Sequence, residues 1–333
     1  GLDVDLIEVK AKSFSSSNGS FRNANGTGDF IARSWLPYLY DIAFQTWVTK
    51  NAYPEWNIEP YLLMADKDTK STVDGLNQLF HVKKDKNHRT SVNITKNIRQ
   101  EMLGDPVLVK VPVKEYVEMI WSGKDIDPSK KTIEDFKSFS DRVREYAEYY
   151  KIDKKFPVDT GLKCKHCEYK NTPQTIAEGL KSGFEECWKD KYGEQYDFNE
   201  PHIFELWDFR GAKDALEQGI HFLKDLSYDA LSKTTPIIPD RGISRVERQW
   251  LQIKKRTGKD LNEEYIDPEL FDEMKEWNYP LHFIDFETSM VAIPFTAGRR
   301  PYEQNAFQFS CHTLHEDGQM KHSEWIHKEP STF

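Results

Sequence analysis

Cysteine, long apolar runs and a leader sequence are scarce or absent in this chain, and each shortage excludes a class of protein. Four cysteines in 333 residues do not make a disulfide framework, so reduced thiols are expected. No run of about eighteen apolar residues occurs, which argues against a transmembrane helix. The start shows no signal-peptide pattern. We therefore expect a cytoplasmic protein that does not insert into membranes.

The chain also lacks an excess of positive charge. Its net charge is −9 at pH 7, so the overall balance does not favour nucleic acid. Binding to a polyanion would depend on local basic clusters such as 83–89, 254–256 and 299–300, each of which also fits a solvated surface. The 38% hydrophobic and 13% aromatic content is enough for a core, and 333 residues allow one large domain or two modest ones.

Strand and helix patterns alternate along the chain, which predicts an α/β fold. Strands are expected at 4–11, 58–65, 106–113, 281–287, 305–314 and 320–327. The last two are joined by Asp317-Gly318, a strong hairpin signal. Helices are expected at 35–50, 133–150, 242–256 and 268–277. The stretch 13–29 is rich in Ser, Asn and Gly and predicts a loop.

The first predicted strand carries Glu8 and Lys10, two residues apart and therefore on one face. A Glu side chain together with the Val9 carbonyl can hold Mg²⁺, which lowers the pKa of a bound water. A lysine beside them can neutralise charge that develops on a phosphate. This combination suits hydrolysis of phosphodiesters. A surface strand with a cross-strand ion pair accounts for the same pattern.

Asp285 and Glu287 also share one face of a predicted strand, with Ile284 and Phe286 on the other face. Two carboxylates on one side repel each other unless a cation lies between them. Mg²⁺ or Mn²⁺ is the usual solution. The apolar residues on both sides of the pair favour a metal site, and the alternative is a strand end whose acids face solvent.

Cys164, Cys167 and Cys187 bring three thiols into one segment. Two cysteines separated by two residues can bind one metal ion from a tight turn. Three with a distant fourth suit a [4Fe–4S] cluster, and three with a histidine, His166 or His202, suit Zn²⁺. Ordinary reduced cysteines are the alternative. Cys311, alone in a strand, is expected to be a core residue.

The strand Leu6–Ala11 followed by the helix with Asp41-Ile42-Ala43-Phe44-Gln45 resembles the RecB-like branch of the PD-(D/E)XK nucleases. The resemblance implies that Glu8 is a metal ligand, that Lys10 is the catalytic lysine and that Gln45 is the helix residue of the active site.

The run Tyr279–Thr288 resembles the first exonuclease motif of the DnaQ-like DEDD nucleases. This resemblance implies that Asp285 and Glu287 bind two catalytic metals on the first strand of an RNase H-like sheet. The residues that we expect to contact the substrate are Thr288, Arg299 and Arg300.

Both sites depart from their family patterns. The Asp that the RecB-like branch carries one strand earlier has no counterpart unless it precedes Gly1, and Thr49 stands where that branch has an aromatic residue. The remaining two aspartates and the His or Tyr of a DEDD site would follow Phe333. We expect the natural protein to extend beyond both ends of this chain, and the chain itself to have little exonuclease activity.

With the runs Ser182–Trp188 and Arg248–Ile253, most of the chain is similar to an uncharacterised bacterial family that fuses these two nucleases through a cysteine segment. The similarity implies a RecB-like core over 1–158, a cysteine metal segment with a helical linker over 159–278, and the start of a DnaQ-like domain over 279–333. It also implies a [4Fe–4S] cluster whose fourth cysteine precedes Gly1.

We therefore expect a nuclease that uses Mg²⁺ or Mn²⁺ to hydrolyse phosphodiester bonds in DNA, in single strands or from ends. A non-catalytic nucleic-acid-binding or assembly protein with incomplete sites is one alternative. An RNA exonuclease is another, because DnaQ-like folds act on either polymer and nothing in the sequence reads a 2′-hydroxyl.

Overall fold

The structure is a computed structural model that describes residues 1–23, 29–95, 97–131, 137–231, 242–260, 262 and 264–328. Its strands and helices alternate as the sequence predicts. The chain divides into two units. The first unit comprises Gly1–Lys154 and Tyr279–Phe333 and contains the strands named below, whereas the second comprises Lys155–Asn278 and contains helices. The α/β class is therefore confirmed.

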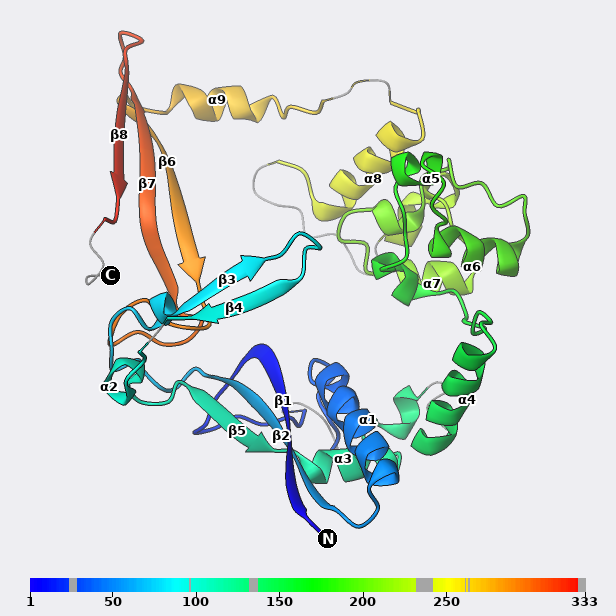
Figure 1. Ribbon diagram of the computed structural model, residues 1–333. Coiled ribbons are helices and arrows are strands. Elements are labelled where there is room, and N and C mark those ends of the chain that lie inside the picture. Colours follow the sequence, from blue (N-terminus) through cyan, green and yellow to red (C-terminus); the bar gives the residue numbers. More distant parts are fainter. Residues whose placement is uncertain are drawn as a thin grey trace. The chain divides into compact units, whose positions relative to one another are not determined.

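The elements are labelled in Figure 1. The strands are β1 (Asp3–Phe14), β2 (Asn57–Asp66), β3 (Phe80–Lys84), β4 (Thr90–Ile94), β5 (Leu108–Pro112), β6 (Leu281–Met290), β7 (Gln304–Leu314) and β8 (Met320–Ile326). The helices are α1 (Leu36–Ala52), α2 (Gln100–Leu103), α3 (Lys114–Trp121), α4 (Phe139–Lys151), α5 (Pro173–Ala177), α6 (Gly183–Tyr192), α7 (Ala212–Glu217), α8 (Arg245–Arg256) and α9 (Glu269–Lys275).

The first sheet has the order β1-β2-β5, with β1 parallel to β2 and β2 antiparallel to β5. Helices α1 and α3 lie beside it (Figure 1), and apolar side chains from sheet and helices form one core. The fully buried members of this core are Leu39, Ile42, Ala43, Leu62 and Val113. Because β1 is the edge strand of this sheet beside α1, side chains on its inner face lie at the border between core and solvent.

Strand β1 and helix α4 have boundaries that differ from the expectation. Strand β1 runs on to Phe14, because residues 13 and 14 still pair with β2 after an irregularity that follows Val9, so the predicted loop starts later. Helix α4 begins at Phe139, where the Ser138 hydroxyl accepts a hydrogen bond from the Asp141 N–H at 3.1 Å. Residues 132–136, in which the predicted helix began, lie outside the described residues.

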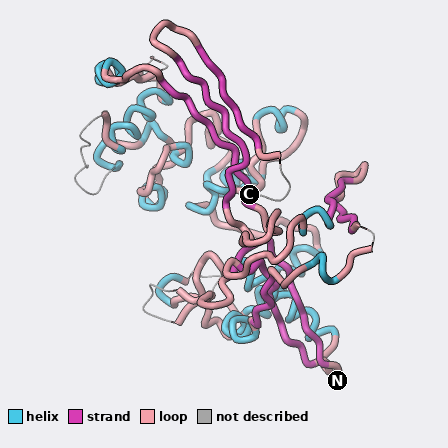
Figure 2. The backbone as a smooth tube through the Cα atoms, turned by 90° about the vertical axis from the view of Figure 1, so that its left-hand side faces the viewer, coloured by secondary structure: helices cyan, strands magenta, loops and turns pink. Residues whose placement is uncertain are grey.

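The second sheet is the antiparallel ribbon β6-β7-β8, whose strands lie side by side in Figure 2. The predicted hairpin at Asp317-Gly318 is confirmed, and Gly318 has a φ of 80°, a conformation that a residue without a Cβ adopts at little cost. The loop between β6 and β7 is tied to the loop after β2: Ser71 N–H donates to the Arg299 carbonyl at 2.9 Å, and Gly75 N–H donates to the Phe295 carbonyl at 2.8 Å.

The second unit has its own core around α7, α8 and short 3₁₀ turns. Helix α8 was predicted to start at Gly242 and starts instead after Ser244, which forms a reciprocal capping box with Glu247. Its end at Arg256, just before Gly258, agrees with the prediction. Among the described residues, no helix has the length and apolar character needed to cross a membrane.

Candidate functional site

Strand β1 presents Glu8 and Lys10 to helix α1. From residue 3 to residue 12 the odd-numbered side chains are exposed and the even-numbered ones are half-buried, so one face of the strand is turned to the protein. Leu6, on that face, packs against the core that α1 shares. The Lys10 Nζ lies 2.8 Å from Glu8 Oε1, and the two side chains keep 17% and 25% of their exposure. The pair is thus largely enclosed but reachable from solvent.

Helix α1 adds two polar side chains to this pair. Gln45 Nε2 donates to Glu8 Oε2 at 2.9 Å, so the structure brings together the three residues that the sequence singled out. The same amide donates to Asp41 Oδ1 at 3.0 Å, and Lys10 Nζ donates to Asp41 Oδ2. The four side chains form a closed ring in which each carboxylate accepts hydrogen bonds from both Lys10 and Gln45.

The ring shifts the pKa values of Lys10 and Asp41 in opposite directions. Burial alone lowers the pKa of Lys10, but the hydrogen bonds to Asp41 and Glu8 outweigh burial and raise that pKa above its ordinary value. Burial alone raises the pKa of Asp41, but the hydrogen bonds from Lys10 and Gln45 and the Lys10 charge lower it overall. At neutral pH the ring therefore contains an ammonium and an ionised Asp41.

The sequence analysis gave Asp41 no role. The signal that identifies it is its spacing, because residues four apart on a helix lie one above the other, so Asp41 and Gln45 face the same way. Burial of the opposite side fixes that face: the buried positions on α1 are Leu39, Ile42, Ala43 and Thr46. A residue four positions before Gln45 on this helix therefore directs its side chain toward the same site.

The acids of β6 have a different environment. Asp285 and Glu287 are both exposed, and among the described residues neither carboxylate has a hydrogen bond or an ion pair. The flanking Ile284 and Phe286 keep 55% and 59% of their exposure, so they do not enclose the carboxylates as the sequence suggested. The geometry gives these acids a common strand but no surrounding site.

Unlike the two acids, the residues expected to contact substrate near β6 have hydrogen-bond partners within the chain. Thr288 Oγ1 accepts a hydrogen bond from Gln304 Nε2 at 3.0 Å. Arg299 Nη1 lies 2.8 Å from Glu303 Oε1, which holds its guanidinium. The Arg300 side chain is exposed, and its backbone N–H donates to Glu303 Oε2 at 2.9 Å. Arg300 is therefore more available to a ligand than Arg299.

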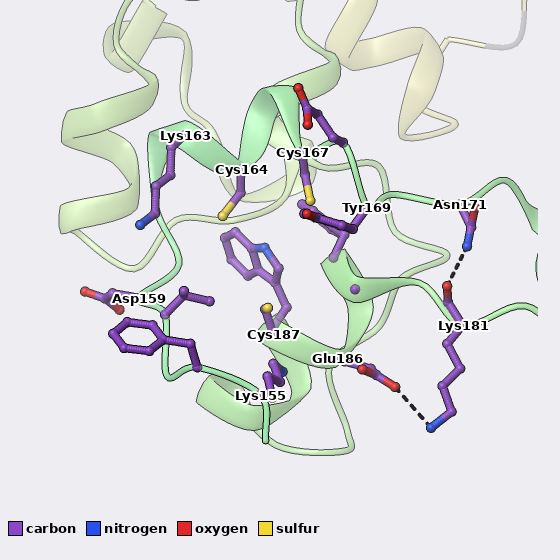
Figure 3. Close-up of a pocket in the computed structure, with 16 residues that line it drawn as sticks. Lys155, Asp159, Lys163, Cys164, Cys167, Tyr169, Asn171, Lys181, Glu186 and Cys187 are labelled. Carbon is purple, nitrogen blue, oxygen red and sulfur yellow. Dashed lines mark hydrogen bonds and ion pairs between the residues drawn. The ribbon is translucent and has the colours of Figure 1, made fainter. Parts of the chain in front are cut away.

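In the second unit, Cys164, Cys167 and Cys187 line one cavity of about 810 Å³. The first two come from the turn at 162–167 and the third from α6, and Figure 3 shows all three sulfur atoms pointing toward the same space. The apolar side chains of Phe184 and Trp188 also line this cavity. The predicted proximity of the three cysteines is thus present, from two separate elements. Cys311, expected in the core, is half-buried on β7.

Neither histidine considered as a zinc ligand lines this cavity. His166 is exposed. His202 is buried, and its Nδ1 accepts a hydrogen bond from the Phe204 N–H at 3.2 Å, which places the ring proton on Nε2. Burial, with smaller effects of His221 and Lys170, lowers the pKa of His202 to about 3. Nδ1 of this neutral ring is therefore occupied by a main-chain donor, and the buried Nε2 has no hydrogen-bond partner among the described residues.

The three thiols share a cavity without being gathered into a ligand set. Within the described ranges, no three His, Cys, Asp or Glu side chains are arranged so that they could hold one metal ion. The cysteine segment and the two acidic sites are therefore candidate sites because of their residue types and locations, and not because of a preformed set of metal ligands.

The structure thus defines an α/β chain with a half-buried Glu-Lys-Gln-Asp ring, an exposed pair of acids and a cysteine-lined cavity. Residues 282–332 match the model of a domain of unknown function, DUF2779, a stretch that spans β7, β8 and nearly all of β6. No curated protein and no solved structure matches the chain.

Proposed function

We propose that the chain is a metal-dependent nuclease that hydrolyses phosphodiester bonds in DNA, in single strands or from ends, with the Glu8 ring as its active site. The observation that carries this proposal is the convergence of Glu8 and Lys10 from β1 with Gln45 from α1 within hydrogen-bond distance. The resemblance of this strand and helix to the RecB-like branch singles out the same three residues. Their contact supports a RecB-like arrangement of this strand and helix.

The donor set suits a hard divalent cation. Glu8 offers carboxylate oxygens and Val9 a main-chain carbonyl, and oxygen is the ligand that Mg²⁺ and Mn²⁺ prefer. Glu8 already lies against one cation, the Lys10 ammonium, at a position that is only partly exposed. A divalent ion bound here would polarise a phosphate and make a bound water more acidic.

The chain's own groups supply the remaining functions. Lys10 carries a positive charge next to the acid and can neutralise the charge that builds up on a phosphate during hydrolysis. Gln45 can orient a water or a phosphate oxygen through its amide. Because strand β1 and helix α1 are fixed by a common core, these groups are held in place before substrate arrives.

The acids of β6 and the cysteine cavity have secondary roles beside the Glu8 ring. We infer that Asp285 and Glu287 are part of an RNase H-like metal site and contribute little cleavage in this chain, because they lie exposed and without partners among the described residues. We also infer that the cysteine cavity binds a [4Fe–4S] cluster, with zinc as the second choice, because three thiols face it from two elements.

A cleavage assay tests the proposal. Labelled single-stranded DNA and RNA are incubated with Mn²⁺ and the whole chain, its Glu8→Gln variant or its Asp285→Asn variant. Cleavage of DNA that falls at least about a hundredfold in Glu8→Gln and changes little in Asp285→Asn is the expected result. Glu8→Gln keeps the size of the side chain, so the comparison isolates the carboxylate charge.

The alternatives give different results in the same assay. Binding of the labelled strands without cleavage by wild type favours a non-catalytic nucleic-acid-binding protein, and cleavage of RNA alone favours an RNA exonuclease. Anaerobic purification of the same protein tests whether the cysteines bind a cluster. A brown colour with absorbance at about 400 nm indicates an iron–sulfur cluster. A colourless protein that contains stoichiometric zinc would contradict the cluster.

A further inference from the structure

The Glu8 ring has two carboxylates that share two donors. Lys10 Nζ contacts Glu8 Oε1 at 2.8 Å and also contacts Asp41 Oδ2. Gln45 Nε2 lies 2.9 Å from Glu8 Oε2 and 3.0 Å from Asp41 Oδ1. Each donor is therefore held from two sides, once by the strand and once by the helix.

A divalent ion at Glu8 would end this equal sharing. Carboxylate oxygens that coordinate Mg²⁺ or Mn²⁺ direct their lone pairs at the ion, so they are weaker acceptors for Lys10 and Gln45. The ion also repels the Lys10 ammonium. A lysine on a flexible four-carbon stem then follows whichever partner remains. In this ring the remaining partner is Asp41.

We propose that Asp41 is a positioning residue that keeps Lys10 and Gln45 at the cleavage site when Glu8 binds a divalent ion. This inference rests on the proposed nuclease function and deepens it, because it separates the roles of the two acids. Glu8 takes the metal, and Asp41 holds the ammonium that acts on the phosphate.

The position of Asp41 suits this role. It lies on α1 next to Ile42 and Ala43, both of which are fully buried in the core, so its backbone is fixed and belongs to a different element from the metal ligand Glu8. One helical turn separates Asp41 from Gln45, which places both of its carboxylate oxygens within reach of the two donors.

The consequence is a split between turnover and metal binding. Loss of Asp41 leaves the Glu8 carboxylate intact, so affinity for the ion is kept. Lys10 and Gln45 lose their second anchor, and misplacement of such groups by about 1 Å can cost on the order of a hundredfold in rate. The effect is therefore expected in kcat rather than in KM or in the Kd for Mn²⁺.

The test compares Asp41→Asn with the matched control Asp5→Asn. Asp5 lies on the opposite, exposed face of β1, where it pairs with Lys110 at 2.7 Å, so the control also removes a carboxylate from a lysine. We expect Asp41→Asn to lower kcat on single-stranded DNA by about tenfold or more. We expect its Kd for Mn²⁺, measured by electron paramagnetic resonance, to stay within about twofold, and Asp5→Asn to match wild type in both.

Two kinetic results would overturn the inference. A kcat within about twofold of wild type in Asp41→Asn would show that Lys10 and Gln45 need no second anchor. A Kd for Mn²⁺ raised about tenfold would make Asp41 a metal ligand instead.

A crystal structure of the wild-type chain grown with Ca²⁺ gives a test that needs no activity and no variant. The inference requires Ca²⁺ at Glu8 with Lys10 Nζ still within hydrogen-bond distance of Asp41. Lys10 turned away from Asp41 would overturn the inference alone and leave the nuclease proposal standing. Absence of Ca²⁺ from Glu8, together with absence of cleavage by wild type, would overturn both.

Discussion

Glu8 and Glu287 are both acids on strands, yet their surroundings differ in almost every respect. Glu8 keeps 25% of its side-chain exposure and accepts hydrogen bonds from Lys10 and Gln45. Glu287 is exposed and has no partner among the described residues. The difference originates in the element that lies beside each strand. Helix α1 crosses the face of β1 that carries Glu8, whereas β6 has the strand β7 as its neighbour.

The comparison shows what turns a pair of charged residues into a candidate site. Side-chain alternation along a strand brings two residues to one face, and both strands achieve that. Preorganisation needs a second element that supplies partners and removes solvent, and only the Glu8 region has one within the described residues. We therefore expect perturbations near Glu8 to have large effects and perturbations near Glu287 to have small ones.

The largest expected effect comes from the core under Glu8. Leu62 is fully buried and lies opposite Glu8 in the β1–β2 register. Leu62→Ala should lower the free energy of unfolding by about 2–5 kcal/mol, because it removes buried methyl groups and leaves a cavity. Ile284 lies next to Asp285 on β6 and is 55% exposed, so Ile284→Ala should lower the free energy of unfolding by less than about 1 kcal/mol. Urea denaturation measures both, and equal losses would contradict the comparison.

Asp68, which lies outside both sites, shows that a carboxylate can have hydrogen-bond partners without being buried. Asp68 is exposed like Glu287, yet it accepts hydrogen bonds from the Ser15 hydroxyl and from the backbone and hydroxyl of Ser17. These bonds lower the pKa of Asp68 from 3.8 to about 2. They join the ends of β1 and β2, so an exposed acid can still fix the strand that carries Glu8.

Because the folded-state pKa of Asp68 lies below its unfolded value, its contribution to stability is complete above about pH 4 and is lost as the pH falls toward 2. Asp68→Asn should therefore be less stable than wild type near neutral pH, with a difference that shrinks between pH 4 and 2. Urea denaturation across this pH range measures the difference. Leu62→Ala changes no ionisable group and serves as the control. A difference for Asp68→Asn that stays constant down to pH 2 would show that the hydrogen bonds do not depend on its charge.

Much of the fold could be predicted because its signals are local. Period-two alternation identified β1, β2 and the β6–β8 ribbon, and Asp317-Gly318 identified the final hairpin. The hairpin formed by β3 and β4 was not predicted, because each strand has only five residues and two apolar side chains, which is too short a run to give a clear alternation. The contact of the loop at 71–75 with the loop at 295–299 was also beyond prediction, because it joins segments more than two hundred residues apart mainly through main-chain atoms.

The candidate site was predictable only in part. Glu8, Lys10 and Gln45 came from a resemblance that supplies their roles but not their contacts, and the structure adds the contacts. Asp41 was missed, although it lies four residues before Gln45 on the same helix, because the resemblance gives a role to Gln45 and none to Asp41. The exposure of Ile284 and Phe286 could not be read from the sequence either, since apolar composition does not reveal whether another element packs on a strand.

The smallest expected effect is that of Glu287→Gln. The substitution keeps the length and shape of the side chain and removes a charge that has no partner among the described residues, so the free energy of unfolding should change by less than about 0.5 kcal/mol. Glu8→Gln is the matched change in the ring, and there it removes the charge that the half-buried Lys10 contacts, at an expected cost of about 1–2 kcal/mol.

Thermal or urea denaturation of the two variants side by side therefore compares the two regions with one chemical change. If Glu287→Gln were as costly as Glu8→Gln, partners supplied by a crossing helix would not be what distinguishes the two acids.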